Sequence, residues 1–332
     1  MGHDERGKKQ TDEKPAASDL INRATEALKA NPDNAELHNS LGVLYFKDGR
    51  ADDAVKEFRE AARLKPDFAM ARINLGNVYL SRGLIDNAIT EYREVLKSGH
   101  ATADVHVRLG AAYERRGMVD DAIREYADAV KLKPADAGIR QSLGAACYKK
   151  GLVAEAIREL KEAARISPGN ADIHYGLGNV YFSKGMLDEA MSQYREALRI
   201  VPNHADARIR LAFVHMKKDA LDDAIGELHA VIMARPQMAA AHGYLSMALL
   251  KKGQIMEAIV EQKEVVRLQP ESADAHYNLG DLYAKNGQMH EAIEEYRAAQ
   301  QIDPGYSKAR MEKDTSDTEG TKAIKATKDA SR

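Results

Sequence analysis

The chain repeats itself every 34 residues, and this period limits the folds that it can adopt. The stretch NLGNVYLSRGLIDNAITEYREVL at residues 74–96 returns as GLGNVYFSKGMLDEAMSQYREAL at residues 176–198, an offset of three periods. Eight copies run without insertion or deletion from Ala35 to Tyr306. The first residue of each copy is alanine, and we number the places of a copy from it: Ala35, Ala69, Ala103, Ala137, Ala171, Ala205, Ala239 and Ala273. A strict period of this length indicates an array of identical structural units.

Each copy predicts two amphipathic helices. In the copy at residues 171–204, apolar residues recur at helical spacing up to Tyr181 and again from Leu187 to Leu198. Place 15 lies between these two stripes and is glycine in seven copies: Gly49, Gly83, Gly117, Gly151, Gly185, Gly253 and Gly287. Asp219 occupies this place in the sixth copy. We expect a left-handed backbone here in all copies, which glycine adopts freely and Asp better than most residues.

Proline marks the end of the second helix. Place 32 is proline in seven of the eight copies and His100 in the second copy. Because proline cannot continue a helix, it ends the second helix and stiffens the turn into the next unit. Neither helix can hide its apolar stripe alone, so the pairs must stack on their neighbours.

These columns resemble the tetratricopeptide repeat. The pattern of that family is matched at His174, Leu177, Gly178, Tyr181, Gly185, Ala190, Tyr194, Ala197 and Pro202, and the resemblance covers about four-fifths of the chain. It implies an all-α, right-handed superhelix of helix pairs, with the first helices on the concave side. It also implies a scaffold or adaptor that binds extended or helical peptide segments of other proteins.

The sequence predicts a polar capping segment at each end of the array. Residues 17–34 predict a single capping helix with Asp19 as its N-cap, and residues 307–313 predict a second capping turn or helix. Residues 1–16 and 314–332 lack apolar content, and we expect them to be disordered. The eight repeats at 35–306 lie between these ends.

Composition excludes several classes of protein. Lys and Arg total 49 against 51 for Asp and Glu, a balance that argues against binding nucleic acid. The charged start of the chain predicts neither a signal peptide nor a membrane span, and the single cysteine, Cys147, excludes an internal disulfide. We therefore expect a cytoplasmic protein, in which Cys147 is a small buried residue at place 11.

The expected ligand-binding surface is one face of the first helices. Places 2, 5, 9, 12 and 13 are left over when the buried stripe is subtracted, and their spacing puts them on one face, with Tyr244 at place 6 close to it. This face is apolar and aromatic, which is typical of a binding surface, although curvature of the array would make part of it core. The predicted peptide-binding residues in the concave groove are Asn39, Phe46, Ile73, Asn77, Leu80, Tyr148, Tyr175, Asn179, Phe182, Ile209, Phe213, Met216, Tyr244, Tyr277 and Asp281.

Place 4 carries five histidines: His38, His106, His174, His242 and His276. A ladder of metal ions along them is excluded, because equivalent places in adjacent units are too far apart to share one ion. We expect these residues to be bulky packing groups between helices. No nucleophile, metal or phosphate-loop motif remains once the repeat is accounted for, so we predict a protein without catalytic activity or cofactor.

Several alternatives to a peptide-binding scaffold remain open. One is the substrate-recognition arm of an enzyme such as a glycosyltransferase, and another is self-association through the ends of the array or its N-terminal helix. RNA binding by helical hairpins is disfavoured by the neutral charge. The sixth and seventh copies depart most from the pattern, with Ala212, Ser246, Leu228 and Gln262 at the places of glycine and of the second aromatic. This departure indicates either a specialised binding segment or a flexible joint.

Overall fold

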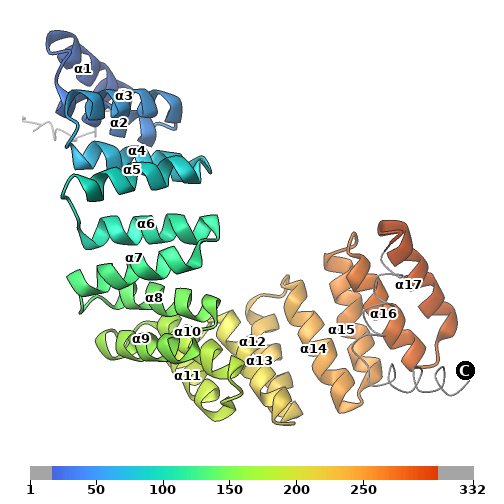
Figure 1. Ribbon diagram of the computed structural model, residues 1–332. Coiled ribbons are helices and arrows are strands. Elements are labelled where there is room, and N and C mark those ends of the chain that lie inside the picture. Colours follow the sequence, from blue (N-terminus) through green and yellow to red (C-terminus); the bar gives the residue numbers. More distant parts are fainter. Residues whose placement is uncertain (1–16, 306–332) are drawn as a thin grey trace, which may run out of the picture. The chain divides into compact units, whose positions relative to one another are not determined.

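The computed structural model describes residues 17–305, and within this range every regular element is an α-helix. The chain divides into two compact units, Met1–Pro168 and Gly169–Arg332. In each unit, successive helices pack side by side in chain order (Figure 1). The predicted tails, 1–16 and 314–332, and the predicted cap at 307–313 lie outside the described residues.

Each of the eight copies forms one helical hairpin, as the sequence predicted. The first helices are α2 (Ala35–Lys47), α4 (Ala69–Ser81), α6 (Ala103–Arg116), α8 (Ala137–Lys150), α10 (Ala171–Ser183), α12 (Ala205–Lys217), α14 (Ala239–Lys252) and α16 (Ala273–Lys285). The second helices are α3 (Ala51–Leu64), α5 (Ile85–Lys97), α7 (Val119–Leu132), α9 (Val153–Ile166), α11 (Leu187–Ile200), α13 (Leu221–Ala234), α15 (Ile255–Leu268) and α17 (Met289–Ile302).

Helix α1 (Ala17–Ala30) precedes the first hairpin and packs against α2. The helix begins at Ala17, so Asp19 lies in its first turn and not at the N-cap as expected. An acidic side chain in the first turn still interacts favourably with the positive end of the helix dipole.

Six of the eight first helices begin at a polar cap, the exceptions being α4 after Phe68 and α14 after Met238, and all eight are followed by a left-handed residue. The side chains of Asn34, Thr102, Asp136 and Asn170 each accept a hydrogen bond from a backbone N–H two or three residues further on. All eight residues at place 15 have a positive φ, which reaches 86° at a glycine and is 62° at Asp219. The prediction for Asp219 is therefore confirmed, and one turn chemistry separates the two helices of every hairpin.

The second helix of the second copy ends without proline. Helix α5 stops at Lys97, and Gly99 follows with a φ of 82°. The N–H groups of Gly99 and His100 donate to the carbonyls of Leu96 and Val95. A left-handed glycine thus ends this helix where the other copies use proline.

Small residues let the two helices of a hairpin pack closely. The alanine at place 20 is 0% exposed in all eight copies. At place 8, a Cβ built on Gly178 would lie 2.6 Å from Cε1 of Tyr194 at place 24, which is also completely buried. The same clash would arise at Gly42 with Phe58 and at Gly76 with Tyr92. In these copies place 8 is therefore glycine because the aromatic ring of the second helix occupies the position of its side chain.

Candidate functional site: the face of the first helices

The first unit exposes part of the predicted face. Phe46 and Tyr148 are 39% and 38% exposed, and Asn39, Ile73, Asn77 and Leu80 are half-buried. The side chain of Asn74 donates to Asn39 Oδ1 at 2.9 Å, which ties α4 to α2 beside this face. Apolar side chains alternate with polar amides along this part of the array.

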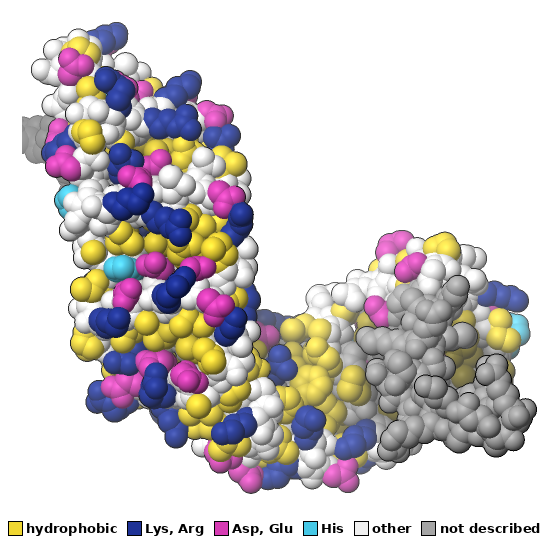
Figure 2. Space-filling model, viewed as in Figure 1, with side chains coloured by type: hydrophobic (Ala, Val, Ile, Leu, Met, Phe, Trp, Pro, Cys, Tyr) yellow, Lys and Arg dark blue, Asp and Glu magenta, His cyan; other side chains and the backbone are white. Residues whose placement is uncertain are grey.

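The second unit carries the more aromatic part of the face. Tyr175, Phe182, Phe213, Tyr244 and Tyr277 are half-buried. The rings of Phe213 and Tyr244 meet edge to face with centroids 4.9 Å apart, so α12 and α14 present one joined aromatic surface. Figure 2 shows hydrophobic side chains gathered around α12 and α14 on the viewed face of this unit.

Two of the predicted residues belong to the core. Ile209 and Met216 on α12 are each only 7% exposed and pack into the same apolar cluster as Leu228 and Leu245. The neighbouring helices cover them, so little of their surface is left for a ligand. We therefore remove both residues from the candidate site.

Tyrosines of the second helices hold the polar residues at place 9. Tyr92 donates to Asn77 Oδ1 at 2.7 Å, and Tyr194 donates to Asn179 Oδ1 at 2.9 Å. Tyr296 donates to Asp281 Oδ1 at 2.8 Å in the same way. These contacts were not predicted, although the shared spacing of 15 residues between the partners was readable in the sequence. They restrict the rotamers of the face, which lowers the entropy that a ligand must overcome on binding.

Burial raises the pKa of Tyr92 to about 12, against a partial opposing effect of the Arg108 guanidinium. Tyrosine in the unfolded chain ionises near pH 10. The contribution of Tyr92 to stability is thus complete below about pH 10 and is lost as the pH rises toward 12. We expect the free energy of unfolding, measured with urea, to fall over this range. It should fall less steeply in Tyr92→Phe, and equal slopes for the two proteins would contradict this assignment.

A polar clasp closes every hairpin at places 4 and 23. His38 Nδ1 lies 2.6 Å from Glu57 Oε2, and Arg140 Nη1 donates to Glu159 Oε2 at 2.6 Å. The corresponding pairs are Arg72–Glu91, His106–Glu125, His174–Gln193, Arg208–Glu227, His242–Glu261 and His276–Glu295. The histidines are therefore hydrogen-bonding groups and not only bulky packing groups, which corrects the sequence-based expectation.

Neither a metal site nor a reactive thiol is indicated by the described residues. Between residues 17 and 305, no group of three or more His, Cys, Asp and Glu side chains is placed to hold a metal ion. Cys147 is 3% exposed, and burial raises the pKa of its thiol. Its environment is that of a structural residue, because reactive cysteines need an accessible thiolate.

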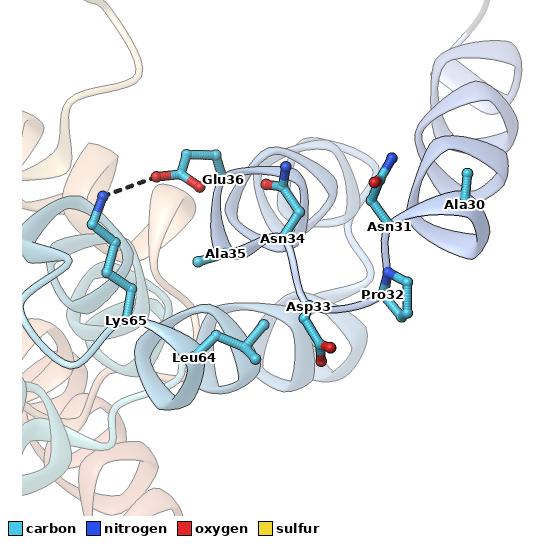
Figure 3. A pocket seen from close by; sticks show the side chains of 9 residues that line it. All are labelled: Ala30, Asn31, Pro32, Asp33, Asn34, Ala35, Glu36, Leu64 and Lys65. Atoms are coloured by element: carbon cyan, nitrogen blue, oxygen red, sulfur yellow. Dashed lines mark hydrogen bonds and ion pairs between the residues drawn. The ribbon is translucent and has the colours of Figure 1, made fainter.

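A polar recess lies where α1 meets the first hairpin. It is lined by Ala30, the turn at 31–34, Ala35, Glu36, Leu64 and Lys65 (Figure 3). Lys65 Nζ binds Glu36 Oε1 at 2.9 Å, and both side chains are about half exposed or more. A wide recess with such a solvated lining gives a ligand little apolar surface to bury.

Models of the tetratricopeptide repeat family match the chain along most of the array. The model described as tetratricopeptide repeat matches residues 21–69, 45–104, 73–137 and 245–307, and the one described as TPR repeat matches residues 144–185 and 178–219. The chain is a tetratricopeptide repeat protein. Repeats of this family are generally non-catalytic modules that bind other proteins.

Solved structures of other proteins share the fold. YrrB, described as a TPR protein with an unusual peptide-binding site, is 24% identical with a TM-score of 0.52 over 60% of this chain and 99% of its own. A tetratricopeptide repeat protein from Parabacteroides merdae is 14% identical with a TM-score of 0.59 over 74% of this chain and 96% of its own. The C-terminal part of a TPR protein from Cytophaga hutchinsonii is 17% identical, with a TM-score of 0.58 over 70% of this chain and 96% of its own. No match was found among curated protein sequences.

Among the described helices, α1 to α17, none combines the length and the apolar character that crossing a bilayer requires.

Proposed function

We propose that this tetratricopeptide repeat protein binds peptide segments of other proteins along the face of its first helices, without catalysing a reaction. The observation that carries the proposal is the joined aromatic surface of the second unit, where Phe213 and Tyr244 meet at 4.9 Å beside the half-buried Tyr175 and Phe182. Exposed aromatic groups with restricted rotamers contribute much of the binding energy at protein interfaces.

Polar groups between the aromatic rings would hold the backbone of the peptide. The Oδ1 atoms of Asn77 and Asn179 accept from tyrosines, so their amide N–H groups are oriented away from those hydroxyls. Lys217 Nζ lies 5.7 Å from the centre of the Phe182 ring, and this cation restricts the ring beside Asn179. A peptide bound here would contact amide donors and apolar surface in alternation. The peptide-binding description of YrrB agrees with such a role.

A variant of three face residues tests this function. Peptides would be selected from a random library on phage, and their affinities measured by fluorescence anisotropy for the wild-type chain. Replacing Tyr175, Phe182 and Phe213 with alanine should weaken binding by about tenfold or more, because the variant lacks the aromatic anchors.

The control replaces exposed apolar residues of the second helices. Met233, Val260 and Ile293 are 86%, 59% and 45% exposed, and their joint replacement with alanine should leave the affinities unchanged. Both variants must show the helical circular dichroism of the wild-type chain. Equal affinities of the two variants would place the binding surface elsewhere.

A further inference from the structure

The seventh copy departs from the repeat at three places that line one space. Place 5 is Gly243, where the other copies carry larger residues such as Ile73, Gln141 and Tyr277. Place 24 is Gln262 in place of an aromatic residue or leucine, and place 8 is Ser246. All three substitutions lie on α14 and α15, next to α16.

These residues leave a hollow between the seventh and eighth copies. Two adjoining cavities of about 230 and 260 Å³ share Gly243, Met247, Gln262 and Asn278 in their walls. We call the two together the anchor hollow. A Cβ built on Gly243 would touch only Val265, at 3.7 Å, so the space is open because this residue has no side chain.

Gln262 supplies an oriented acceptor in the wall of the hollow. Gln262 is only 4% exposed, and its Nε2 donates to the carbonyl oxygen of Ala275 at 3.0 Å. A carbonyl oxygen can only accept, so the amide orientation is chemically determined and Oε1 points away from Ala275. Among the described residues, no fully buried side-chain nitrogen or oxygen lacks a partner. Oε1, which is not hydrogen-bonded to the described protein, is therefore reachable from the hollow.

The rest of the lining combines apolar walls with a net negative charge. Met247, Leu250 and Leu282 supply apolar surface, and Met247 is 52% exposed. The charged side chains of the lining are Asp274, Asp281 and Lys285, and Lys285 is exposed. Asp281 Oδ1 accepts from Tyr296, which orients the carboxylate. Acceptors at the end of an apolar passage suit a long side chain with a cationic head.

We propose that the anchor hollow binds a lysine or arginine side chain of the peptide that lies on the face of the first helices; this inference rests on the proposed function. The aliphatic stem packs against Met247, Leu250 and Leu282. The cationic head donates to Gln262 Oε1 and to the Asp281 carboxylate. The smaller cavity, of about 230 Å³, has room for roughly seven water-sized groups, close to the number of non-hydrogen atoms in an arginine side chain.

Two variants fill the hollow in different ways. Ser246→Gly with Gln262→Tyr restores the glycine and tyrosine that the second, third, fifth and eighth copies carry. Both changes are needed, because a Cβ at place 8 would lie 2.6 to 2.8 Å from a tyrosine ring at place 24. Gly243→Leu fills the hollow from the other wall. Its matched control is Gly226→Leu on α13, where a Cβ would meet nothing within 4 Å.

The first experiment measures side-chain preference with a positional-scanning library of unstructured peptides, read by fluorescence anisotropy. The wild-type chain and Gly226→Leu should bind peptides with Lys or Arg at one position about tenfold more tightly than peptides with Leu there. Both filled variants should lose this preference while keeping the aromatic-dependent binding. A preference for apolar residues in the wild-type chain, or a basic preference that survives filling, would overturn the proposal and leave the proposed function intact.

The second experiment tests the hollow without a peptide. With methionine methyl groups labelled by ¹³C, N-acetylargininamide should shift the Met247 signal and leave Met233 unchanged, whereas N-acetylnorleucinamide should shift neither. Gly243→Leu should abolish the shift. An unmoved Met247 signal would overturn the anchor hollow, whereas a shifted signal without any peptide binding would count against the proposed function alone.

Discussion

Gly178→Val is expected to lower the free energy of unfolding by about 3 kcal/mol. Its Cβ would lie 2.6 Å from the Tyr194 ring, a distance at which one of the groups must move. Tyr194 cannot move easily, because its ring is fully buried and its hydroxyl is hydrogen-bonded to Asn179. Urea denaturation followed by circular dichroism measures the loss.

Gly226→Val controls for the change in helix propensity. Gly226 lies inside α13, and no atom would lie within 4 Å of a Cβ there. Replacing glycine with valine at such a site is neutral or slightly stabilising, by up to about 0.5 kcal/mol. If both variants lost stability equally, steric exclusion by Tyr194 would not be the reason for glycine at place 8.

Arg140→Met is expected to cost about 2 to 3 kcal/mol. Arg140 donates to Glu159 at 2.6 Å and to the carbonyl of Pro134 at 2.8 Å. The Glu159 side chain is only 8% exposed, so removing Arg140 leaves a largely buried carboxylate, which then has Arg158 as its ion-pair partner. Denaturation by urea at neutral pH gives the loss.

Three further variants test whether the loss comes from the unpaired Glu159 carboxylate. Arg140→His should retain most of the stability, because His38 makes the corresponding contacts to Glu57 and Pro32. Arg140→Met combined with Glu159→Leu should also recover most of the loss, since no buried charge remains. Lys131→Met, which breaks the exposed pair with Asp128, should change stability by less than about 1 kcal/mol. A loss in Arg140→Met no larger than in Lys131→Met would contradict a role for the clasp.

The turn between the two helices of a hairpin could be predicted by comparing one place, place 15, across the eight copies. The positive φ of Asp219 was expected from its place among seven glycines, and it is observed. Such features depend on the local backbone, so a column of like residues is enough to predict them.

The candidate face was readable only in part. Places 5, 9 and 12 do share a face, yet Ile209 and Met216 are buried by neighbouring helices while Phe46 is not. The contacts from Tyr92 to Asn77 and from His38 to Glu57 join residues 15 and 19 positions apart on different helices. The periodicity of one helix carries no information about which side chain of the next helix reaches it.

The amino-acid sequence alone was enough to establish the period, the helix pairs and the family, because these follow from spacing that every copy repeats. Packing between helices decided which face residues stay accessible, how the tyrosines orient them and where the seventh copy leaves its hollow. Gly243, Ser246 and Gln262 could be recognised in the sequence as departures from the repeat. The sequence did not decide between a specialised binding segment and a flexible joint. Their effect depends on the volume that three helices leave unfilled, and this volume is a property of the packed structure.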